Sequence, residues 1–425
     1  MSDRIIYKGT ARGRASAPPS KSYAHRYLIA SFLASVCGGK SSVIHNIALS
    51  EDISATLDCI RALGGEYTYE NGTVTIFGQY TKPKNDVVLN CRESGSTLRF
   101  FIPIAAALVD CTIFKGSKKL ISRGIGIYEN LFAEQGISCT KSDDTIKIER
   151  ALRGGSFKID GSVSSQFVTG LLFALPLLGE DSDIEIVPPV QSGPYIEITE
   201  DILSKAGITI EVNGNHLHIP GSQKYKPLEI TCEGDYSNAA FLDMFNFIGG
   251  EVEVVGLNED SKQGDKIYKD LFTRISNGHC TIDLADCIDL GPVLFTLAAI
   301  KFGAKFVNTA RLRLKESDRV ADMCPELEKI GTKCTIGENT VEISGLALTE
   351  NDGPLDGKCH LTDKLLRLQK QNIVFDSHND HRIAMSMSVL ASLFTATVTN
   401  GDAVCKSYPG FYDDLASLKI ETREI

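Results

Sequence analysis

The feature that most constrains the fold is an internal repeat of about six copies, each built around one apolar helical segment. Polar or charged residues come directly before every one of these segments. The segments are expected to form helices over residues 27–37, 100–109, 167–178, 239–248, 293–300 and 383–393. Because a repeated unit buries its core by packing against neighbouring copies, the order of elements in one copy predicts the fold of the whole chain.

Each copy continues past its apolar helix in a common order of strand, polar loop and second helix, and four copies end in a hairpin. In the first copy, residues 42–47 are expected to form a strand and residues 53–63 an amphipathic helix. Asn71-Gly72 between alternating runs is a strong hairpin signal. Further hairpin turns are expected at Asp143-Asp144, Asn213-Gly214-Asn215 and Glu338-Asn339. The fourth and sixth copies lack a clear hairpin.

The length of 425 residues exceeds what one hydrophobic core usually holds, so two domains of three copies each are expected. The break should lie near residues 231–235. A short strand at residues 4–8 precedes Ala17-Pro18-Pro19-Ser20, where proline favours a crossing segment over a continuing helix. We therefore predict an α/β fold with an N-terminal domain of residues 18–232 and a C-terminal domain of residues 233–425 together with 1–17.

Composition excludes several classes of protein. The hydrophobic fraction of 43% can build a core, yet no apolar run reaches the roughly 18 residues that a membrane span needs. The first residues lack the apolar stretch of a signal peptide, so a cytoplasmic location is expected. The 12 cysteines include no Cys-x-x-Cys pair, which argues against zinc or a redox motif.

Charge predicts a local anion site in an acidic protein. The formal net charge of −10 argues against nucleic acid as a partner, because phosphate-backbone binding needs a broad basic surface. Cations nevertheless recur at equivalent loop ends of the repeats, namely Lys21, Arg26, Arg99, Arg123, Lys315, Arg319, Arg382 and Lys406. Each alone is an ordinary surface or capping charge, but their recurrence beside helix N-termini favours binding of a small, multiply charged ligand.

Six motifs carry a resemblance to a known family. They are Ser20-Lys21-Ser22 with Arg26, Gly95-Ser96-Thr97 with Arg99, Ser164-Ser165-Gln166-Phe167, Pro194-Tyr195-Ile196, Lys315-Glu316-Ser317-Asp318-Arg319 and Asn379-Asp380-His381-Arg382-Ile383-Ala384-Met385. In these motifs the chain resembles the 5-enolpyruvylshikimate-3-phosphate synthases nearly end to end. The resemblance implies two domains of three βαβαββ units, in the inside-out barrel arrangement of enolpyruvyl transferases. It also implies transfer of the enolpyruvyl group of phosphoenolpyruvate to the 5-hydroxyl of shikimate 3-phosphate, in chorismate and aromatic amino acid biosynthesis.

The resemblance also implies the substrate-binding residues. Those for phosphoenolpyruvate are Lys21, Gly95, Arg123, Gln166, Arg319, Arg382 and Lys406. Those for shikimate 3-phosphate are Lys21, Ser22, Arg26, Ser164, Ser165, Gln166, Ser192, Tyr195, Asp289 and Lys315. No cofactor or metal is expected, and these two small molecules are the only partners expected for what should be a monomer.

The chemistry explains why carboxylates are wanted. Adding a hydroxyl group to C2 of phosphoenolpyruvate requires removal of the hydroxyl proton and delivery of a proton to C3. The tetrahedral intermediate then loses the C3 proton and expels phosphate. By resemblance the catalytic residues are Asp289 and Glu316, with Lys21 and His381. Which carboxylate moves which proton stays open, as does whether His381 is an acid–base group or orients its neighbours.

Two of these assignments have rivals, and the chain departs from the family pattern in places. Asp286 is the rival of Asp289, and Glu316 could instead cap its own helix. Glu93-Ser94-Gly95-Ser96 stands where many members have Asn-Ala-Gly-Thr, and Phe100 and Gly124 stand where proline is common. Arg311 occupies the position of a substrate-binding asparagine in some members, so it is left out of the predicted site.

Other functions fit the residues less well. UDP-N-acetylglucosamine enolpyruvyl transferases carry a Lys-Asn pair and a reactive cysteine, whereas this chain has Lys21-Ser22 and no cysteine in residues 115–123. A non-catalytic anion-binding protein would not need both Asp289 and Glu316. The 3′-phosphate RNA cyclases need a histidine motif that is not found.

Since the predicted ligand residues come from both domains, we expect an open free enzyme that closes on its anionic substrates. Glyphosate, the inhibitor of the family, should favour closure together with shikimate 3-phosphate.

Overall fold

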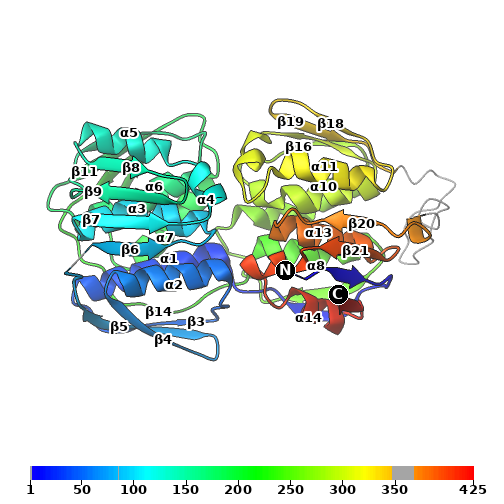
Figure 1. Ribbon diagram of the computed structural model, residues 1–425, viewed down its shortest axis with the longest axis horizontal. Helices are drawn as coiled ribbons and strands as arrows, with labels where there is room; N and C mark the ends of the chain where they lie inside the picture. The colour runs from blue at the N-terminus through cyan, green and yellow to red at the C-terminus, as the bar shows by residue number, and fades with distance from the viewer. Residues whose placement is uncertain (1, 85, 347–367) are drawn as a thin grey trace. The chain divides into compact units, whose positions relative to one another are not determined.

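The computed structural model describes residues 2–84, 86–346 and 368–425 of the chain (Figure 1). The chain forms two compact units, each with mixed α/β structure as the sequence predicted. We call Pro19–Glu233 the N-terminal unit, and Met1–Pro18 with Gly234–Ile425 the C-terminal unit. The cysteines that the structure describes are all free thiols. Within the described residues, no helix is both long and apolar enough to cross a bilayer.

The N-terminal unit contains three four-stranded sheets. Their strands are β3 (Ser42–His45), β4 (Gly65–Glu70), β5 (Thr73–Tyr80), β6 (Val87–Asn90), β7 (Cys111–Lys115), β8 (Ser138–Lys141), β9 (Thr145–Glu149), β10 (Ser156–Asp160), β11 (Ser182–Val187), β12 (Glu211–Asn213), β13 (His216–Ile219) and β14 (Glu229–Thr231). The sheet orders are β14-β3-β5-β4, β6-β7-β9-β8 and β10-β11-β13-β12. In each sheet the first pair is parallel and the other pairs are antiparallel, which is the βαβαββ order of the repeat.

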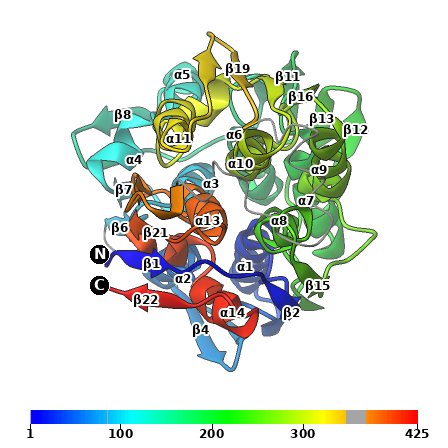
Figure 2. The ribbon, with the colours of Figure 1, turned by 90° about the vertical axis from the view of Figure 1, so that its right-hand side faces the viewer.

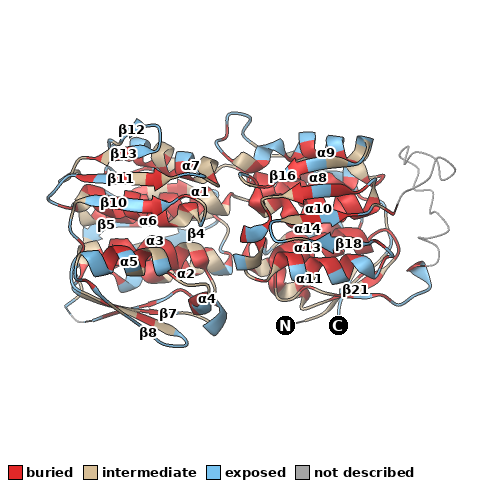
Figure 3. Cartoon of the chain, turned by 90° about the horizontal axis from the view of Figure 1, so that it is seen from above, coloured by how far each residue is buried: buried red, intermediate tan, exposed pale blue. Residues whose placement is uncertain are grey.

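The helices of the N-terminal unit are either fully buried or amphipathic. They are α1 (Lys21–Val36), α2 (Glu51–Ala62), α3 (Gly95–Leu108), α4 (Lys118–Ser122), α5 (Gly126–Glu134), α6 (Ser165–Ala174), the 3-10 turn η1 (Leu175–Leu177) and α7 (Gly193–Lys205). Nearly all of α1, α3 and α6 is buried, as expected of helices that are apolar on every side. α3 packs on α6 and α1 on α7, and Figure 3 shows the buried residues along α3 and α6 in red.

The C-terminal unit repeats this plan with two variations. Its strands are β1 (Arg4–Ile6), β2 (Arg12–Ser16), β15 (Glu251–Val255), β16 (Cys280–Asp283), β17 (Ala304–Val307), β18 (Cys334–Ile336), β19 (Thr340–Ile343), β20 (Val374–Asp376), β21 (Ala396–Thr399) and β22 (Thr422–Glu424). They form sheets in the orders β16-β17-β19-β18, β20-β21-β1-β22 and β15-β2.

The N-terminal segment of the chain completes the two copies that lack a hairpin. β2 lies parallel to β15 and serves as the first strand of the fourth copy. β1 lies between β21 and β22, antiparallel to both, at the place of the hairpin strand in the sixth copy. The predicted return of residues 1–17 to pair with the C-terminal part of the chain is therefore confirmed.

The buried helices of the C-terminal unit are α8, α10 and α13. Its helical elements are α8 (Tyr236–Phe247), η2 (Gly264–Ile267), α9 (Tyr268–Asn277), η3 (Ile288–Leu290), α10 (Gly291–Ile300), η4 (Ala310–Leu314), α11 (Arg319–Glu328), α13 (His381–Ala391), η6 (Gly401–Lys406) and α14 (Phe411–Ser417). Figure 2 shows the three buried helices close to end-on, with the strands of this unit around them.

The buried helices begin earlier than the apolar pattern predicted. Side chains of Ser94, Ser164, Asp235 and Asp380 accept backbone N–H groups of the turn that follows, and each caps its helix one residue before it starts. The predicted starts are wrong because hydrophobic periodicity marks only the packed part of a helix and misses a capped polar turn. The polar residues thus belong to the first turns of these helices. The four predicted hairpin turns are all found between paired strands.

Candidate active site

The first turns of the buried helices hold several of the residues that the sequence singled out. The second helical residues of α1, α3, α6, α8, α10 and α13 are Ser22, Ser96, Gln166, Ser237, Pro292 and Arg382. The repeat therefore presents one equivalent position six times, three times in each unit. Serine, glutamine and arginine at this position can bind an anion beside the positive end of a helix dipole.

In the C-terminal unit, one buried arginine organises the site. The side chain of Arg319 is 1% exposed, and its Nε lies 2.8 Å from Asp380 Oδ2. Its Nη2 lies 2.6 Å from Glu316 Oε2, and its Nη1 lies 3.1 Å from Asp289 Oδ1. Burial alone would lower the pKa of this guanidinium, but the three carboxylates raise it above its ordinary value. Arg319 is therefore a permanent cation that fixes three carboxylates around itself.

Asp289 is shared among three cations. Besides Arg319, its carboxylate lies 3.2 Å from Lys315 Nζ and 3.4 Å from Arg382 Nη2. It sits in the 3-10 turn η3, which leads directly into α10. The rival Asp286 is exposed and precedes that turn. This placement supports Asp289 as the carboxylate of the site.

Lys315 has a lowered pKa. Burial lowers the pKa of its ammonium group to about 8, although the neighbouring Asp289 favours the charged form. The side chain stays 20% exposed, so an arriving ligand could reach it. At neutral pH most of Lys315 is charged, and the charge is lost as pH rises through about 8.

The start of α13 adds further groups. Arg382 is buried, and its Nη2 donates to Ser237 Oγ at 2.9 Å. Burial lowers the pKa of Arg382, but nearby carboxylates, Asp289 first, raise it overall. His381, the first residue of α13, is also buried. Lys406 Nζ donates to the carbonyl oxygen of Asn379 at 2.7 Å, just before this helix.

Asp380 belongs to one of the six motifs but was not among the predicted site residues. Asp380 is completely buried, and both of its carboxylate oxygens pair with Arg319. It also accepts from Ser317 Oγ at 3.3 Å and from the backbone N–H of Arg382 at 2.9 Å. One carboxylate therefore joins Arg319 to the helix that carries Arg382. The signal available in the sequence was an N-cap aspartate directly before a histidine, an arginine and an apolar helix.

In the N-terminal unit, Lys21 forms an ion pair at the starts of two helices. Its Nζ lies 2.8 Å from Oδ2 of Asp52, which belongs to the first turn of α2. The two side chains are 17% and 13% exposed. Asp52 was not predicted, because nothing near it in the sequence marks it as a partner of a lysine in another helix.

A second cluster lies at the start of α3. A Cβ atom at Gly95 would lie 3.1 Å from both terminal nitrogens of Arg123 and 3.2 Å from Arg99 Nη1, so only glycine leaves ordinary room for these guanidinium groups. Arg99 Nη1 donates to Gln166 Oε1 at 2.6 Å, and Gln166 Nε2 donates to Ser96 Oγ at 3.0 Å. The structure thus brings Gly95, Arg123 and Gln166 together, and it adds Arg99 and Ser96.

Arg26 joins three helices from inside the unit. It is buried, and burial lowers its pKa to about 10. Its guanidinium donates to Thr199 Oγ1 at 2.8 Å, to the carbonyl oxygen of Ser22 at 2.8 Å and to that of Tyr195 at 3.1 Å. A weaker bond of 3.3 Å reaches Thr169 Oγ1. These contacts hold the start of α7, which carries Tyr195, against α1 and α6.

The predicted serines stand at helix starts in the same unit. Ser164 caps α6, with its Oγ accepting from the backbone N–H of Gln166, and Ser165 is the first residue of that helix. Ser192 directly precedes α7, where a backbone φ of 61° places it in the left-handed region. Its side chain is buried.

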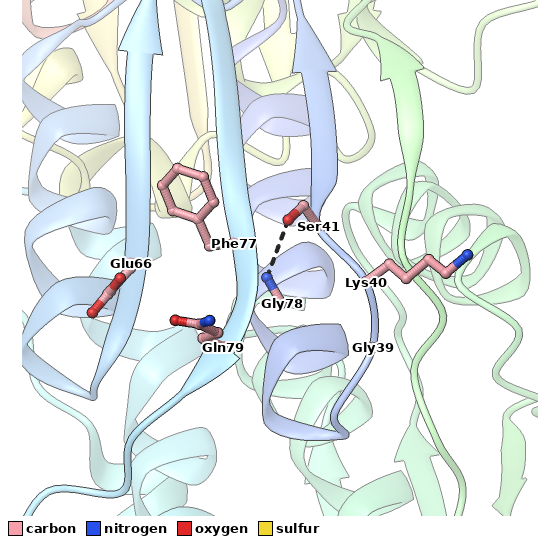
Figure 4. Close-up of a pocket in the computed structure, with 7 residues that line it drawn as sticks. All are labelled: Gly39, Lys40, Ser41, Glu66, Phe77, Gly78 and Gln79. Carbon is pink, nitrogen blue, oxygen red and sulfur yellow. Dashed lines mark hydrogen bonds between the residues drawn. The ribbon is translucent and has the colours of Figure 1, made fainter.

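A pocket in the N-terminal unit lies away from these residues. Figure 4 shows the side chains that line it, namely Lys40, Ser41, Glu66, Phe77 and Gln79, together with Gly39 and Gly78. Gly39 follows the C-terminal end of α1, whose 16 residues span about 24 Å, so the pocket is at the opposite end of that helix from Lys21. None of the predicted site residues lines it.

Among the described residues, no group of three His, Cys, Asp or Glu side chains could hold a metal ion.

Comparisons with known proteins agree with one another. Residues 7–415 match a family described as EPSP synthase (3-phosphoshikimate 1-carboxyvinyltransferase). A 3-phosphoshikimate 1-carboxyvinyltransferase from Clostridium perfringens is 37% identical, with 100% of both chains covered. One from Clostridium kluyveri is 37% identical, with 97% of this chain and 96% of that protein covered.

Solved structures share the fold. An EPSP synthase from Acinetobacter baumannii superposes with a TM-score of 0.76 at 22% identity, covering 100% of both chains. The enolpyruvyl transferase NikO from Streptomyces tendae superposes with a TM-score of 0.74 at 13% identity, covering 100% of this chain and 99% of that one. At such low identity these similarities show that the fold is shared, and they do not show which reaction is catalysed.

Proposed function

This chain belongs to the EPSP synthase family. We propose that the ion-pair network around Asp289 is the site at which the enzyme transfers an enolpyruvyl group between its substrates. The reaction of the family is transfer of that group from phosphoenolpyruvate to shikimate 3-phosphate, in aromatic amino acid biosynthesis. The observation that carries the proposal is the position of Asp289, which lies within 3.4 Å of Lys315, Arg319 and Arg382. One carboxylate among three cations is suited to a reaction between two anionic substrates.

Phosphoenolpyruvate would be bound by its carboxylate and phosphate groups. Among the described residues, Arg382 Nε and Nη1 are buried without a hydrogen-bond partner, so these donors could receive an anionic oxygen. Arg319 already pairs with three carboxylates, and an incoming anion would have to exchange places with one of them. The residues that we assign to this substrate are Lys21, Gly95, Arg123, Gln166, Arg319, Arg382 and Lys406.

Shikimate 3-phosphate would be bound by hydroxyl groups, cations and Asp289. The residues that we assign to it are Lys21, Ser22, Arg26, Ser164, Ser165, Gln166, Ser192, Tyr195, Asp289 and Lys315. Arg26 donates its hydrogen bonds to groups of the protein itself, so its main effect in the free chain is to hold Tyr195 in place. Closure on substrate, the monomeric state and a cytoplasmic location stay predictions.

The proton transfers would be divided between Asp289 and Glu316. Each is held against Arg319, which positions both carboxyl groups for proton transfer. As the 5-hydroxyl oxygen bonds to C2, its proton leaves to one of them in its ionised form, while C3 gains a proton from the other, which is protonated at that step. The tetrahedral intermediate then returns a proton from C3 to the group that delivered it, and the C2–O bond to phosphate breaks with its electron pair leaving on phosphate. Lys21 and His381 would assist by charge and orientation.

The direct test is an assay with both substrates in the presence of a chelator. We expect phosphate to appear only when phosphoenolpyruvate and shikimate 3-phosphate are both present, together with a product of the mass of enolpyruvylshikimate 3-phosphate. Either substrate alone serves as the control. Phosphate release that depends on UDP-N-acetylglucosamine instead would overturn the assignment.

Lys315 should make the reaction sensitive to alkaline pH. Its pKa in the free protein is lowered to about 8, so the charged form that attracts the substrate phosphate is lost as pH rises through that value. We expect kcat/KM for shikimate 3-phosphate to fall above about pH 8, since kcat/KM reports groups of the free enzyme. In Lys315→Arg the cation persists to much higher pH, and this alkaline fall should disappear. If the same fall remains in that variant, the titrating group is not Lys315.

A further inference from the structure

The fourth copy of the repeat contributes no residue to the site assigned above, although its helix starts like the others. Ser237 is the second residue of α8, the position that Ser22, Gln166 and Arg382 occupy in their own helices. Three of these equivalent residues are already assigned to substrates. The fourth copy instead directs its serine to Arg382, whose Nη2 lies 2.9 Å from Ser237 Oγ.

The direction of the hydrogen bonds around Ser237 is fixed by its neighbours. Its hydroxyl has a single proton, and Oδ1 of Asp235 lies only 2.6 Å from the oxygen. Since an ionised carboxylate can only accept, Ser237 donates to Asp235 and its lone pairs face Arg382. Asp235 is itself held by the backbone N–H of Asn238 at 2.9 Å, as the cap of α8. All these side chains are buried.

Ser237 and Asp289 compete for the same nitrogen. Arg382 Nη2 is 2.9 Å from Ser237 Oγ and 3.4 Å from Asp289 Oδ2, so the serine has the closer contact. Without the hydroxyl group, the unscreened attraction between opposite charges would draw the guanidinium toward Asp289. That movement would also shift Arg382 Nε and Nη1 from their present positions. These two nitrogens have no hydrogen-bond partner among the described residues.

We infer that Ser237 and Asp235 form a positioning pair that holds Arg382 off Asp289 and keeps its remaining donors directed at the anionic donor substrate. The inference rests on the proposed function, in which Arg382 binds phosphoenolpyruvate. Ser237 and Asp235 act through Arg382 and need not touch the substrate. The pair also explains why a copy without a hairpin keeps a polar helix start.

The test separates the two Michaelis constants. Ser237→Ala is expected to raise KM for phosphoenolpyruvate about tenfold, as for loss of a hydrogen bond to a charged group, and to change KM for shikimate 3-phosphate less than about twofold. Ser237→Thr keeps the hydroxyl group and should restore most of the affinity. Asp235→Asn keeps the helix cap, because asparagine caps as well as aspartate, and removes only the charge, so it should give a smaller change in the same direction.

Ser388→Ala is the matched control. Ser388 is a buried serine of α13 whose Oγ donates to the carbonyl oxygen of Ala384, and it should show no separation of the two constants. Thermal unfolding of every variant would show whether the fold is kept. Should Ser237→Ala not fold, Ser237→Cys replaces it, since a thiol is a much weaker acceptor.

Arg382→Lys distinguishes failure of this inference from failure of the proposed function. If that variant raises KM for phosphoenolpyruvate while Ser237→Ala changes neither constant, the positioning role is wrong and the assignment of Arg382 stands. If Ser237→Ala affects both substrates equally, Ser237 has only a structural role. If Arg382→Lys affects both substrates equally or neither, Arg382 does not bind this substrate, and the inference is overturned along with that assignment.

Discussion

Replacing Asp289 by asparagine, or Glu316 by glutamine, is expected to lower kcat by at least about 100-fold while both substrates still bind. Each change keeps the size of the side chain and removes its ability to accept a proton. Both carboxyl groups lie against Arg319, at 3.1 Å and 2.6 Å, so the arginine holds them in place for proton transfer. The measurements are steady-state phosphate release and substrate binding by titration calorimetry.

Asp286→Asn is the control for this prediction. Asp286 is exposed and stands three residues before Asp289, so its replacement should leave kcat within about twofold of the parent, as is usual for a surface change. The opposite pattern, with Asp286→Asn damaging and Asp289→Asn mild, would mean that the catalytic aspartate has been misassigned by one turn. A large loss of substrate binding in both active-site variants would mean that the carboxylates mainly organise the cations.

Replacing Asp380 by alanine is expected to lower the free energy of unfolding by about 3–5 kcal/mol, the effect of breaking a buried ion pair by removing one partner. Asp380 is completely buried and pairs through both oxygens with Arg319, whose side chain is 1% exposed. The variant leaves that guanidinium with less compensating charge and also removes the cap of α13. Urea denaturation followed by circular dichroism would measure the change.

Asp318→Ala offers a matched comparison. Asp318 also caps a helix, α11, but its side chain is 36% exposed and its ion pair with Arg313 spans 3.4 Å. Loss of that cap should cost about 1 kcal/mol, because an exposed ion pair adds little. Equal losses in the two variants would show that capping alone accounts for the role of Asp380. Asp380→Asn, which keeps a good cap and removes the charge, should behave more like Asp380→Ala than like Asp318→Ala.

The repeat and its boundaries could be predicted from the sequence because they depend on local patterns. Turns such as Asn71-Gly72 are encoded in adjacent residues, and the return of the N-terminal segment followed from a proline-marked crossing. The starts of the buried helices were predicted too late, because a capping side chain acts through one hydrogen bond that leaves no periodic signal.

The partners within the site could not be predicted in the same way. Arg319 meets Asp380 across 61 positions of sequence, and Arg382 meets Ser237 across 145. No local pattern relates residues so far apart, and family resemblance predicted groups that would bind substrate but not those that hold them in place. Glu316 shows the contrast, since it pairs with Arg319 from only three residues away, in the bend that directly precedes α11.

The position of β1 has a consequence for synthesis of the chain on the ribosome. β1 is made long before β21 and β22, yet it is hydrogen-bonded to both of them, one on each side. At about 5–20 residues per second, roughly 20–80 seconds separate the two events. The N-terminal unit can fold in that interval, since Pro19–Glu233 is one uninterrupted stretch. Until their partner strands are made, β1 and β2 therefore expose unpaired backbone N–H and C=O groups. Such strands can pair wrongly with another chain during translation.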